Sequence, residues 1–296
     1  MAPLIRRDLS GEKPQMYEGP LRPLVQKLLR NGKSLFAIVT LLTVLLIALL
    51  ADVIAPYHYN EQNLGRRLQP PSSRHLFGTD ALGRDVFSRV LYGARMTLFL
   101  GVTITFFTSL IGITLGLISG YAGGIIDLVV RKVMDVLWAF PIIVLALGLA
   151  ALLGPSTENL ILVLSVLLWI PFARVVRAKV LVIKELPFVK YARAIGMNPV
   201  RLIFRHIFPN VLSDIIVLFV LTIPDAMMSS AALSFLGLGV QPPTPEWGAI
   251  ISDGRPYLFT APWISAFPGL FLLLVALSFN LLGDVLTDIL NPRVGR

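Results

Sequence analysis

The sequence predicts an all-α polytopic membrane protein with six transmembrane helices, and three observations support this. Hydrophobic residues make up 55% of the chain and charged residues only 15%, whereas a typical soluble domain carries about 25% charged residues. The mean hydropathy is +0.77. Six continuous apolar runs approach the roughly 20 residues that a helix needs to cross the hydrocarbon core. Strands of a β-barrel would instead appear as alternating segments of about ten residues.

The predicted spans follow one another along the chain. They occupy approximately residues 34–55, 96–120, 136–157, 159–176, 215–236 and 263–283. The first run follows a polar, basic arm at residues 1–33 and is longer than the ~7–15-residue core of a cleavable signal peptide. We therefore interpret it as a retained first transmembrane helix.

Two spans contain charged or helix-breaking residues. The fourth is expected to continue as a helix past Arg174 and Arg177, because long basic side chains can reach the headgroups. The fifth contains Pro224 and Asp225, so we expect a kink or a break there. An acid inside a span is by default a candidate functional residue. The alternative for Asp225 is structural, with its carboxylate hydrogen-bonding backbone groups that the proline leaves free.

The distribution of Lys and Arg predicts that both termini face the cytoplasm. With this orientation 19 of the 26 basic residues lie inside, and seven lie outside. The long outer loop is residues 57–95, the large inner loop is residues 174–210, and residues 291–296 form a cytoplasmic tail. Membrane topology accounts for the net charge of +9, so we do not expect nucleic-acid binding.

The inner loop contains a predicted short helix at residues 187–199. Pro187 suits its first turn, and Asn198-Pro199 should end it. The apolar positions share one helical face, and they are Phe188, Tyr191, Ala192, Ile195 and Gly196. Lys190 and Arg193 lie off this face. The apolar stripe either packs against the inner helix ends of the same chain or docks into a groove on a cytoplasmic partner, and both interpretations stay open.

The segment Lys190-Tyr191-Ala192, followed by Gly196 and then Pro209, resembles the coupling loop of ABC importer permeases. In this family motif Glu and Ala stand where this chain has Lys190 and Tyr191. Three further blocks look like the dipeptide/oligopeptide/nickel subfamily, and its C-type permease in particular: Phe77-Gly-Thr-Asp-Ala-Leu-Gly-Arg-Asp-Val-Phe-Ser-Arg, Ser119-Gly-Tyr-Ala-Gly-Gly, and Leu233-Ser-Phe-Leu-Gly-Leu-Gly-Val-Gln-Pro-Pro-Thr-Pro-Glu-Trp-Gly.

This resemblance implies a type I ABC importer permease fold in a bacterial or archaeal cell membrane. It implies a second homologous permease, two ABC ATPase subunits that carry ATP and Mg²⁺, and an extracytoplasmic binding protein. The substrate would be a dipeptide, an oligopeptide or a related small solute. The residues expected to contact the ATPase are Phe188, Lys190, Tyr191, Ala192, Arg193, Ile195, Gly196 and Pro209.

Other functions lack a signal in the sequence. The chain has no Gly-x-x-x-x-Gly-Lys-[Ser/Thr] loop and no cysteine, and its three histidines are far apart. We therefore expect no catalytic, cofactor or metal site in this chain. The main alternative is an ion-coupled secondary transporter, but such proteins tend to show internal repeats, and none is clear here.

Two outer segments have open roles. Residues 82–95 can form an amphipathic helix that lies on the membrane surface or packs on the partner permease. Residues 241–262 are rich in proline and include Trp247, and Trp263 follows them. This segment either contacts the binding protein and shapes the outer gate, or anchors the chain at the membrane interface.

Overall fold

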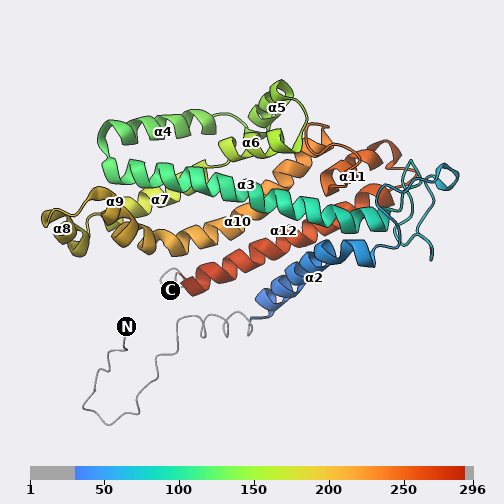
Figure 1. The fold of residues 1–296 in the computed structure, drawn as a ribbon, viewed down its shortest axis with the longest axis horizontal. Helices are drawn as coiled ribbons and strands as arrows, with labels where there is room; N and C mark the ends of the chain where they lie inside the picture. The colour runs from blue at the N-terminus through green and yellow to red at the C-terminus, as the bar shows by residue number, and fades with distance from the viewer. Residues whose placement is uncertain (1–30, 291–296) are drawn as a thin grey trace, which may run out of the picture.

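The computed structural model of the protein describes residues 31–290. The predicted tail at residues 291–296 and most of the predicted N-terminal arm lie outside the described residues. Within the described part, all regular elements are helices, and one isolated bridge joins Thr79 and Asp85. The helices form an elongated bundle, with α8 and α9 at one end and α11 at the other (Figure 1). We refer to these as the α8 end and the α11 end.

Five helical stretches are long and apolar enough to cross a membrane, and a bent pair gives a sixth if it counts as one span. The five are α2 (Gly32–Ile54), α3 (Val86–Ala122), α6 (Thr157–Leu167) with α7 (Ile170–Ile183), α9 (Pro199–Leu202) through η2 (Ile203–Ile207) to α10 (Phe208–Phe235), and α12 (Trp263–Leu290). Helical membrane segments were therefore predicted correctly, but several bounds differ.

Helix α3 begins ten residues earlier than its predicted span, so the outer loop ends at residue 85. The side chain of Asp85 caps it, accepting a hydrogen bond from the Ser88 backbone N–H at 2.7 Å. Such a cap satisfies a donor that has no partner inside the helix. Most of the predicted amphipathic segment 82–95 is thus the first part of a continuous 37-residue helix, about 55 Å long at 1.5 Å per residue.

The third span, predicted at residues 136–157, is not one continuous helix in the structure. In its place, α4 (Gly124–Trp138) and α5 (Ile142–Leu153) meet at a bend of 90°. Pro141 stands at the bend, and a proline disfavours helical conformation in the residue before it. Arg131 and Lys132, expected in a loop, belong to α4, and Arg131 Nε lies 3.2 Å from Asp127 Oδ2.

The fourth span continues as a helix past Arg174 and Arg177 to Ile183, as predicted. Arg177 Nη2 donates to Asp127 Oδ2 at 2.7 Å and joins α7 to α4. Helices α3 and α7 pack closely because Gly112, Gly116 and Gly120 recur every four residues on α3. A Cβ atom on Gly116 would lie 2.8 Å from the Ala173 carbonyl oxygen. Small residues at this spacing let membrane helices approach each other.

Helix α10 runs without interruption through Pro224, so the expected break is absent. Neighbouring helices can compensate for a proline inside a membrane helix, and Pro224 is buried against them. The helix also begins earlier than the predicted span, with Pro209 in its first turn. This proline has no N–H to leave unsatisfied there.

Helix α11 (Trp247–Gly254) and η3 (Arg255–Tyr257) lie between α10 and α12 near the α11 end. Trp247 is fully buried, and its Nε1 donates to the Val90 carbonyl oxygen at 2.9 Å. Gly248 lies against the Ala231 backbone, where a Cβ would be 2.5 Å from Ala231 Cα. Trp247 therefore holds α11 inside the bundle, and its side chain is not available to lipid headgroups.

Candidate functional site

Helix α8 (Pro187–Ala194) forms where the sequence predicts a short helix. Pro187 occupies its first turn, and Gly196 follows it with a φ of +77°. The Met197 N–H donates to the Ala192 carbonyl at 3.1 Å, and the Gly196 N–H donates to the Arg193 carbonyl at 3.0 Å. These two bonds are a Schellman motif, in which glycine is favoured because the position is left-handed. No atom lies within 4 Å of a Cβ placed on Gly196, so its role within the chain is conformational.

The predicted apolar stripe of α8 is divided between two faces. Val189 and Ala192 are buried and pack with residues of α7, α9 and α10, including Val180, Leu202 and Val211. In contrast, Phe188 is 44% exposed, Tyr191 70% and Ile195 61%. The sequence interpretation missed Val189, although its spacing of three residues from Ala192 is a helical signal. One face thus anchors α8, and the other is open.

The open face of α8 has apolar neighbours on the next two elements. Val200 of α9 and Phe204 of η2 are also exposed large apolar side chains. Helix α8 packs against α9, and α9 packs against η2. We define the α8 surface as Phe188, Tyr191, Ile195, Val200 and Phe204. Exposed apolar clusters of this kind mark interaction sites.

The charged residues of α8 have partners within the chain. Lys190 Nζ lies 3.0 Å from Glu185 Oε2, with both side chains exposed, and this hydrogen bond lowers the pKa of the Glu185 carboxyl. The Arg193 guanidinium lies 5.5 Å from the centre of the Tyr121 ring. Lys190 and Arg193 thus both make contacts within the chain, and these contacts help to fix the orientation of α8.

Polar contacts connect the α8 end to several helices. Lys184 Nζ donates to the Gly120 carbonyl at the end of α3, at 2.9 Å. Lys179 Nζ of α7 lies 3.0 Å from Asp214 Oδ1 of α10. Together with the Asp127–Arg177 pair, these contacts link α3, α4, α7 and α10 near the α8 end.

Asp225 lies on an exposed face of α10, between the buried residues Pro224 and Ala226. Its carboxylate makes no hydrogen bond or ion pair among residues 31–290. The hydrogen bond to freed backbone that a structural role requires is therefore not found there. Pro209, another predicted site residue, is exposed at the start of α10, close in sequence to Phe204.

A cluster of four charged residues at the α11 end was not predicted as a unit. Asp80 Oδ2 lies 2.6 Å from Arg84 Nε and 2.6 Å from Arg89 Nη1. Asp253 Oδ2 of α11 lies 3.0 Å from Arg84 Nη2 and 2.8 Å from Arg89 Nη2. Three of the four residues belong to the block that begins at Phe77. The cluster ties the outer loop and the start of α3 to α11.

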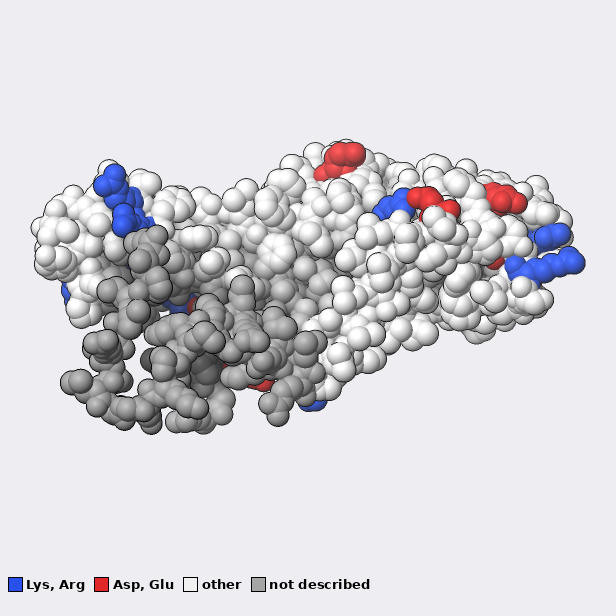
Figure 2. Space-filling model, turned by 60° about the horizontal axis from the view of Figure 1, so that its bottom comes forward, with Lys and Arg blue, Asp and Glu red and all other residues white. Residues whose placement is uncertain are grey.

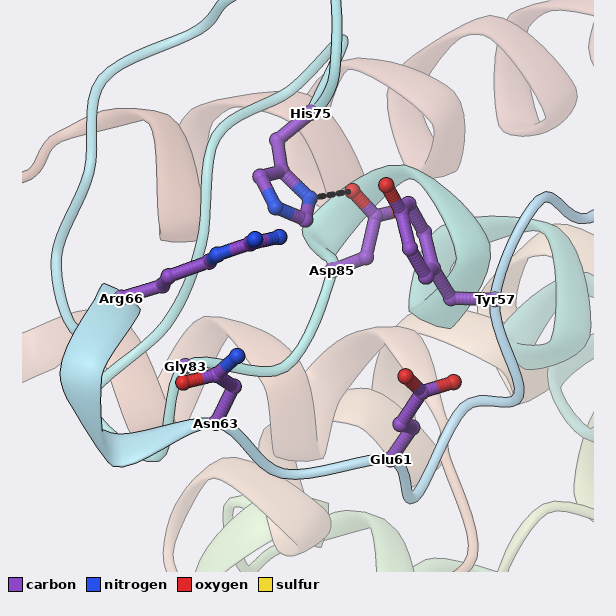
Figure 3. Close-up of a pocket in the computed structure, with 7 residues that line it drawn as sticks. All are labelled: Tyr57, Glu61, Asn63, Arg66, His75, Gly83 and Asp85. Carbon is purple, nitrogen blue, oxygen red and sulfur yellow. Dashed lines mark hydrogen bonds and ion pairs between the residues drawn. The ribbon is translucent and has the colours of Figure 1, made fainter.

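A small pocket beside this cluster is lined by Tyr57, Glu61, Asn63, Arg66, His75, Gly83 and Asp85 (Figure 3). His75 Nδ1 lies 2.9 Å from Asp85 Oδ1, the carboxylate that caps α3. The pocket volume is about 20 Å³, which is the space of about one water molecule. It is too small for a peptide, and no group of three His, Asp or Glu residues in the described part could hold a metal ion.

Comparisons with known proteins agree with these features. Residues 112–296 match the family described as binding-protein-dependent transport system inner membrane component, and residues 19–71 match the N-terminal TM domain of oligopeptide transport permease C. A dipeptide transport system permease protein of Alkalihalophilus pseudofirmus is 42% identical over 93% of this chain and 90% of the relative. A glutathione transport system permease protein of Pectobacterium atrosepticum is 40% identical over 93% and 92%. A putative peptide transport system permease protein of Brucella abortus is 39% identical over 96% of both chains.

Proposed function

The chain belongs to the family of binding-protein-dependent transport system inner membrane components, and we propose that it forms half of a peptide translocation pathway and couples to ATPase subunits through α8. It is a non-catalytic, multi-pass permease subunit of an ABC importer in the bacterial inner membrane. Such permeases work with another permease, ATPase subunits and a binding protein. The proposal adds one homologous permease, two ATPase subunits that carry ATP and Mg²⁺, and the residues that meet them.

The observation that carries the coupling proposal is the divided face of α8. Val189 and Ala192 hold the helix against α7 and α10 from one side. From the other side, Phe188, Tyr191 and Ile195 are available to a partner. A short helix that presents apolar anchors can dock into a groove. Because the same helix is packed on the bundle, movement of the docked partner would be transmitted to the transmembrane helices.

The distribution of charge supports a cytoplasmic α8 end. Lys and Arg side chains are visible at both ends of the face in Figure 2, and a few charged side chains lie between them. Ten of the 18 Lys and Arg residues between residues 31 and 290 lie in α4 or in the segment from α7 to η2, near the α8 end. Such an excess marks the cytoplasmic side. In our proposal α4 and α5 form one broken span, so that the chain crosses the membrane six times and both termini face the cytoplasm.

Asp225 supports a pathway between two permeases. A charged side chain at membrane depth faces a water-filled cavity or a protein partner and not lipid. No partner of Asp225 lies among residues 31–290, so in our proposal its face of α10 lines the pathway opposite the second permease. We propose short peptides as the substrate, because the similar permeases are named for dipeptide, glutathione and peptide transport.

The test uses the complete transporter purified with its partner subunits. Tyr191→Glu with Ile195→Glu would place two charges on the α8 surface without touching Val189 or Ala192. We expect normal insertion, loss of the ATPase subunits during purification and loss of peptide uptake. The matched control is Leu64→Glu, an equally exposed apolar residue of η1 (Leu64–Arg66) at the α11 end, which should keep the ATPases. Full retention and full peptide-stimulated hydrolysis in the double variant would contradict the proposal.

Uptake into vesicles separates this proposal from an ion-coupled secondary transporter. We expect peptide accumulation only with ATP and all subunits present. Accumulation that follows an ion gradient without ATP would support the alternative.

A further inference from the structure

A cleft of about 380 Å³ opens beside α3 near the α11 end. Its lining comes from the loop after α2, from α3 and from the loop before α11: Tyr59, Tyr92, Arg95, Met96, Phe99, Thr244 and Pro245. None of these residues belongs to the α8 surface or to the face of Asp225. The coupling and pathway proposals therefore leave this cleft without a role.

The rim of the cleft carries a positive and a negative group side by side. Arg95 Nη2 lies 3.0 Å from Asp52 Oδ2 of α2, and the two side chains are 49% and 64% exposed. Arg95 Nε also donates to the Ala48 carbonyl at 3.0 Å, whereas Nη1 has no hydrogen-bond partner among the described residues. The rings of Tyr59 and Tyr92 meet edge to face at 5.0 Å beside this pair.

An apolar row leads from the cleft along the membrane part of α3. Phe99, Val102 and Phe106 are exposed and lie on one face, since their spacing is three and four residues. From Arg95 to Phe106 the helix rises by about 16 Å, which is close to half of the ~30 Å hydrocarbon core. Arg95 at the headgroup level would thus place Phe106 near the middle of the bilayer.

The row faces away from the rest of the bundle. Gly101, about half a turn from Phe99, contacts the Met227 side chain of α10. Phe99 therefore points away from α10, and its surroundings in this chain are the cleft and the membrane. Aromatic and basic side chains at this level are typical membrane-interface anchors.

We propose that this cleft binds one phospholipid with a zwitterionic, amine-bearing headgroup, of which phosphatidylethanolamine is the probe. The phosphate accepts hydrogen bonds from Arg95, the ammonium group donates to Asp52, and one acyl chain lies along Phe99, Val102 and Phe106. A headgroup with both charges complements the Arg95–Asp52 pair. A purely anionic headgroup would meet repulsion from Asp52 beside its phosphate.

The bound lipid would connect three separate segments of the chain. Asp52 belongs to α2, Arg95 to α3, and Thr244 to the loop that leads into α11. In our proposal the lipid thus joins α2 and the loop before α11 to α3 at the membrane surface.

The test is photolabelling of the complete transporter in vesicles of phosphatidylethanolamine and phosphatidylglycerol, with a phosphatidylethanolamine that carries a photoreactive acyl chain. We expect the peptide with Met96 and Phe99 to be labelled several-fold above the α2 peptide with Leu42 and Leu46. These two leucines are exposed to a degree similar to that of Phe99. Thr244→Trp narrows the mouth of the cleft and should lower this labelling to the α2 level. The matched control is Thr260→Trp, at an exposed threonine outside the cleft, which should leave it unchanged.

Asp52→Asn tests the headgroup. This variant keeps an oxygen acceptor for Arg95, so labelling of the cleft should persist. Unlabelled phosphatidylethanolamine should then reduce this labelling no more than unlabelled phosphatidylglycerol does. Equal labelling of the two peptides, or labelling that Thr244→Trp leaves unchanged, would overturn the proposal. So would a cross-link from a photoreactive side chain at position 99 to the second permease, because the cleft would then hold protein. Equal competition by both lipids in the unaltered protein would overturn the headgroup assignment.

Discussion

Arg89 of α3 and Asp253 of α11 are 164 positions apart in the sequence, yet Arg89 Nη2 donates to Asp253 Oδ2 at 2.8 Å. The same guanidinium donates through Nη1 to Asp80 of the outer loop at 2.6 Å. Asp80 is buried, whereas the side chain of Asp253 is 40% exposed. A buried acid between two arginines thus holds the loop between α2 and α3, and a more exposed acid holds α11.

This difference in burial predicts unequal effects of two conservative substitutions. Removing one partner of a buried ion pair costs about 3–5 kcal/mol because it leaves an uncompensated charge. Asp80→Asn leaves Arg84 and Arg89 with Asp253 alone, and we expect a loss of about 3 kcal/mol in folding stability. For Asp253→Asn we expect about 1 kcal/mol, since solvent screens the exposed pair. Thermal unfolding of the purified protein measures both, and equal shifts would contradict the assignment.

The left-handed conformation of Gly196 predicts an order among substitutions. Asparagine tolerates positive φ better than other residues with a side chain, and β-branched residues tolerate it least. Gly196→Asn should keep most peptide-stimulated ATP hydrolysis, Gly196→Ala should keep less, and Gly196→Val should keep very little. The three variants are compared in the reconstituted transporter. If Gly196→Val were as active as Gly196→Asn, the conformational role of this glycine would be wrong.

The exposed carboxylate of Asp225 predicts a transport defect without an assembly defect. Asp225→Asn removes the charge and keeps the shape of the side chain, so the subunit composition of the transporter should be unchanged. Peptide uptake should fall at least about tenfold, which corresponds to a rise of about 1.4 kcal/mol in the free-energy barrier to transport. Ile216→Leu, at an exposed position on the opposite face of α10, serves as the control and should transport normally. Unchanged uptake by Asp225→Asn would argue against a place in the pathway.

Close packing of α3 on α7 predicts that Gly116 and Gly148 respond differently to the same change. A Cβ on Gly116 would meet the Ala173 carbonyl at 2.8 Å and Val176 Cβ at 2.9 Å, whereas no atom lies within 4 Å of a Cβ on Gly148 in α5. Overpacking costs about 1–3 kcal/mol, so Gly116→Ala should lower the unfolding temperature and Gly148→Ala should not. Similar unfolding temperatures for the two variants would show that the helices adjust without cost.

The sequence was most informative where one local rule governs the structure. Pro187 correctly predicted the first residue of α8, because proline suits the first turn of a helix. The predicted end at Asn198-Pro199 is wrong, since α8 ends at Ala194, before the left-handed Gly196, and Pro199 begins α9. Hydropathy failed where a helix extends beyond the apolar run. The first ten residues of α3, which include Arg89 and Tyr92, were predicted as a separate amphipathic helix, and only the structure shows that they continue without a break into the second span.

By itself, the sequence determined that this protein is a helical membrane protein, since the lipid core requires long apolar helices. Its motifs resemble those of ABC importer permeases, and its pattern placed a short helix in the largest basic loop. Only the tertiary structure decided which side of that helix is open. Val189 and Ala192 are buried because α7 and α10 meet there, and the same packing leaves Phe188, Tyr191 and Ile195 exposed. Burial depends on neighbours that are distant along the chain, and local periodicity carries no information about them.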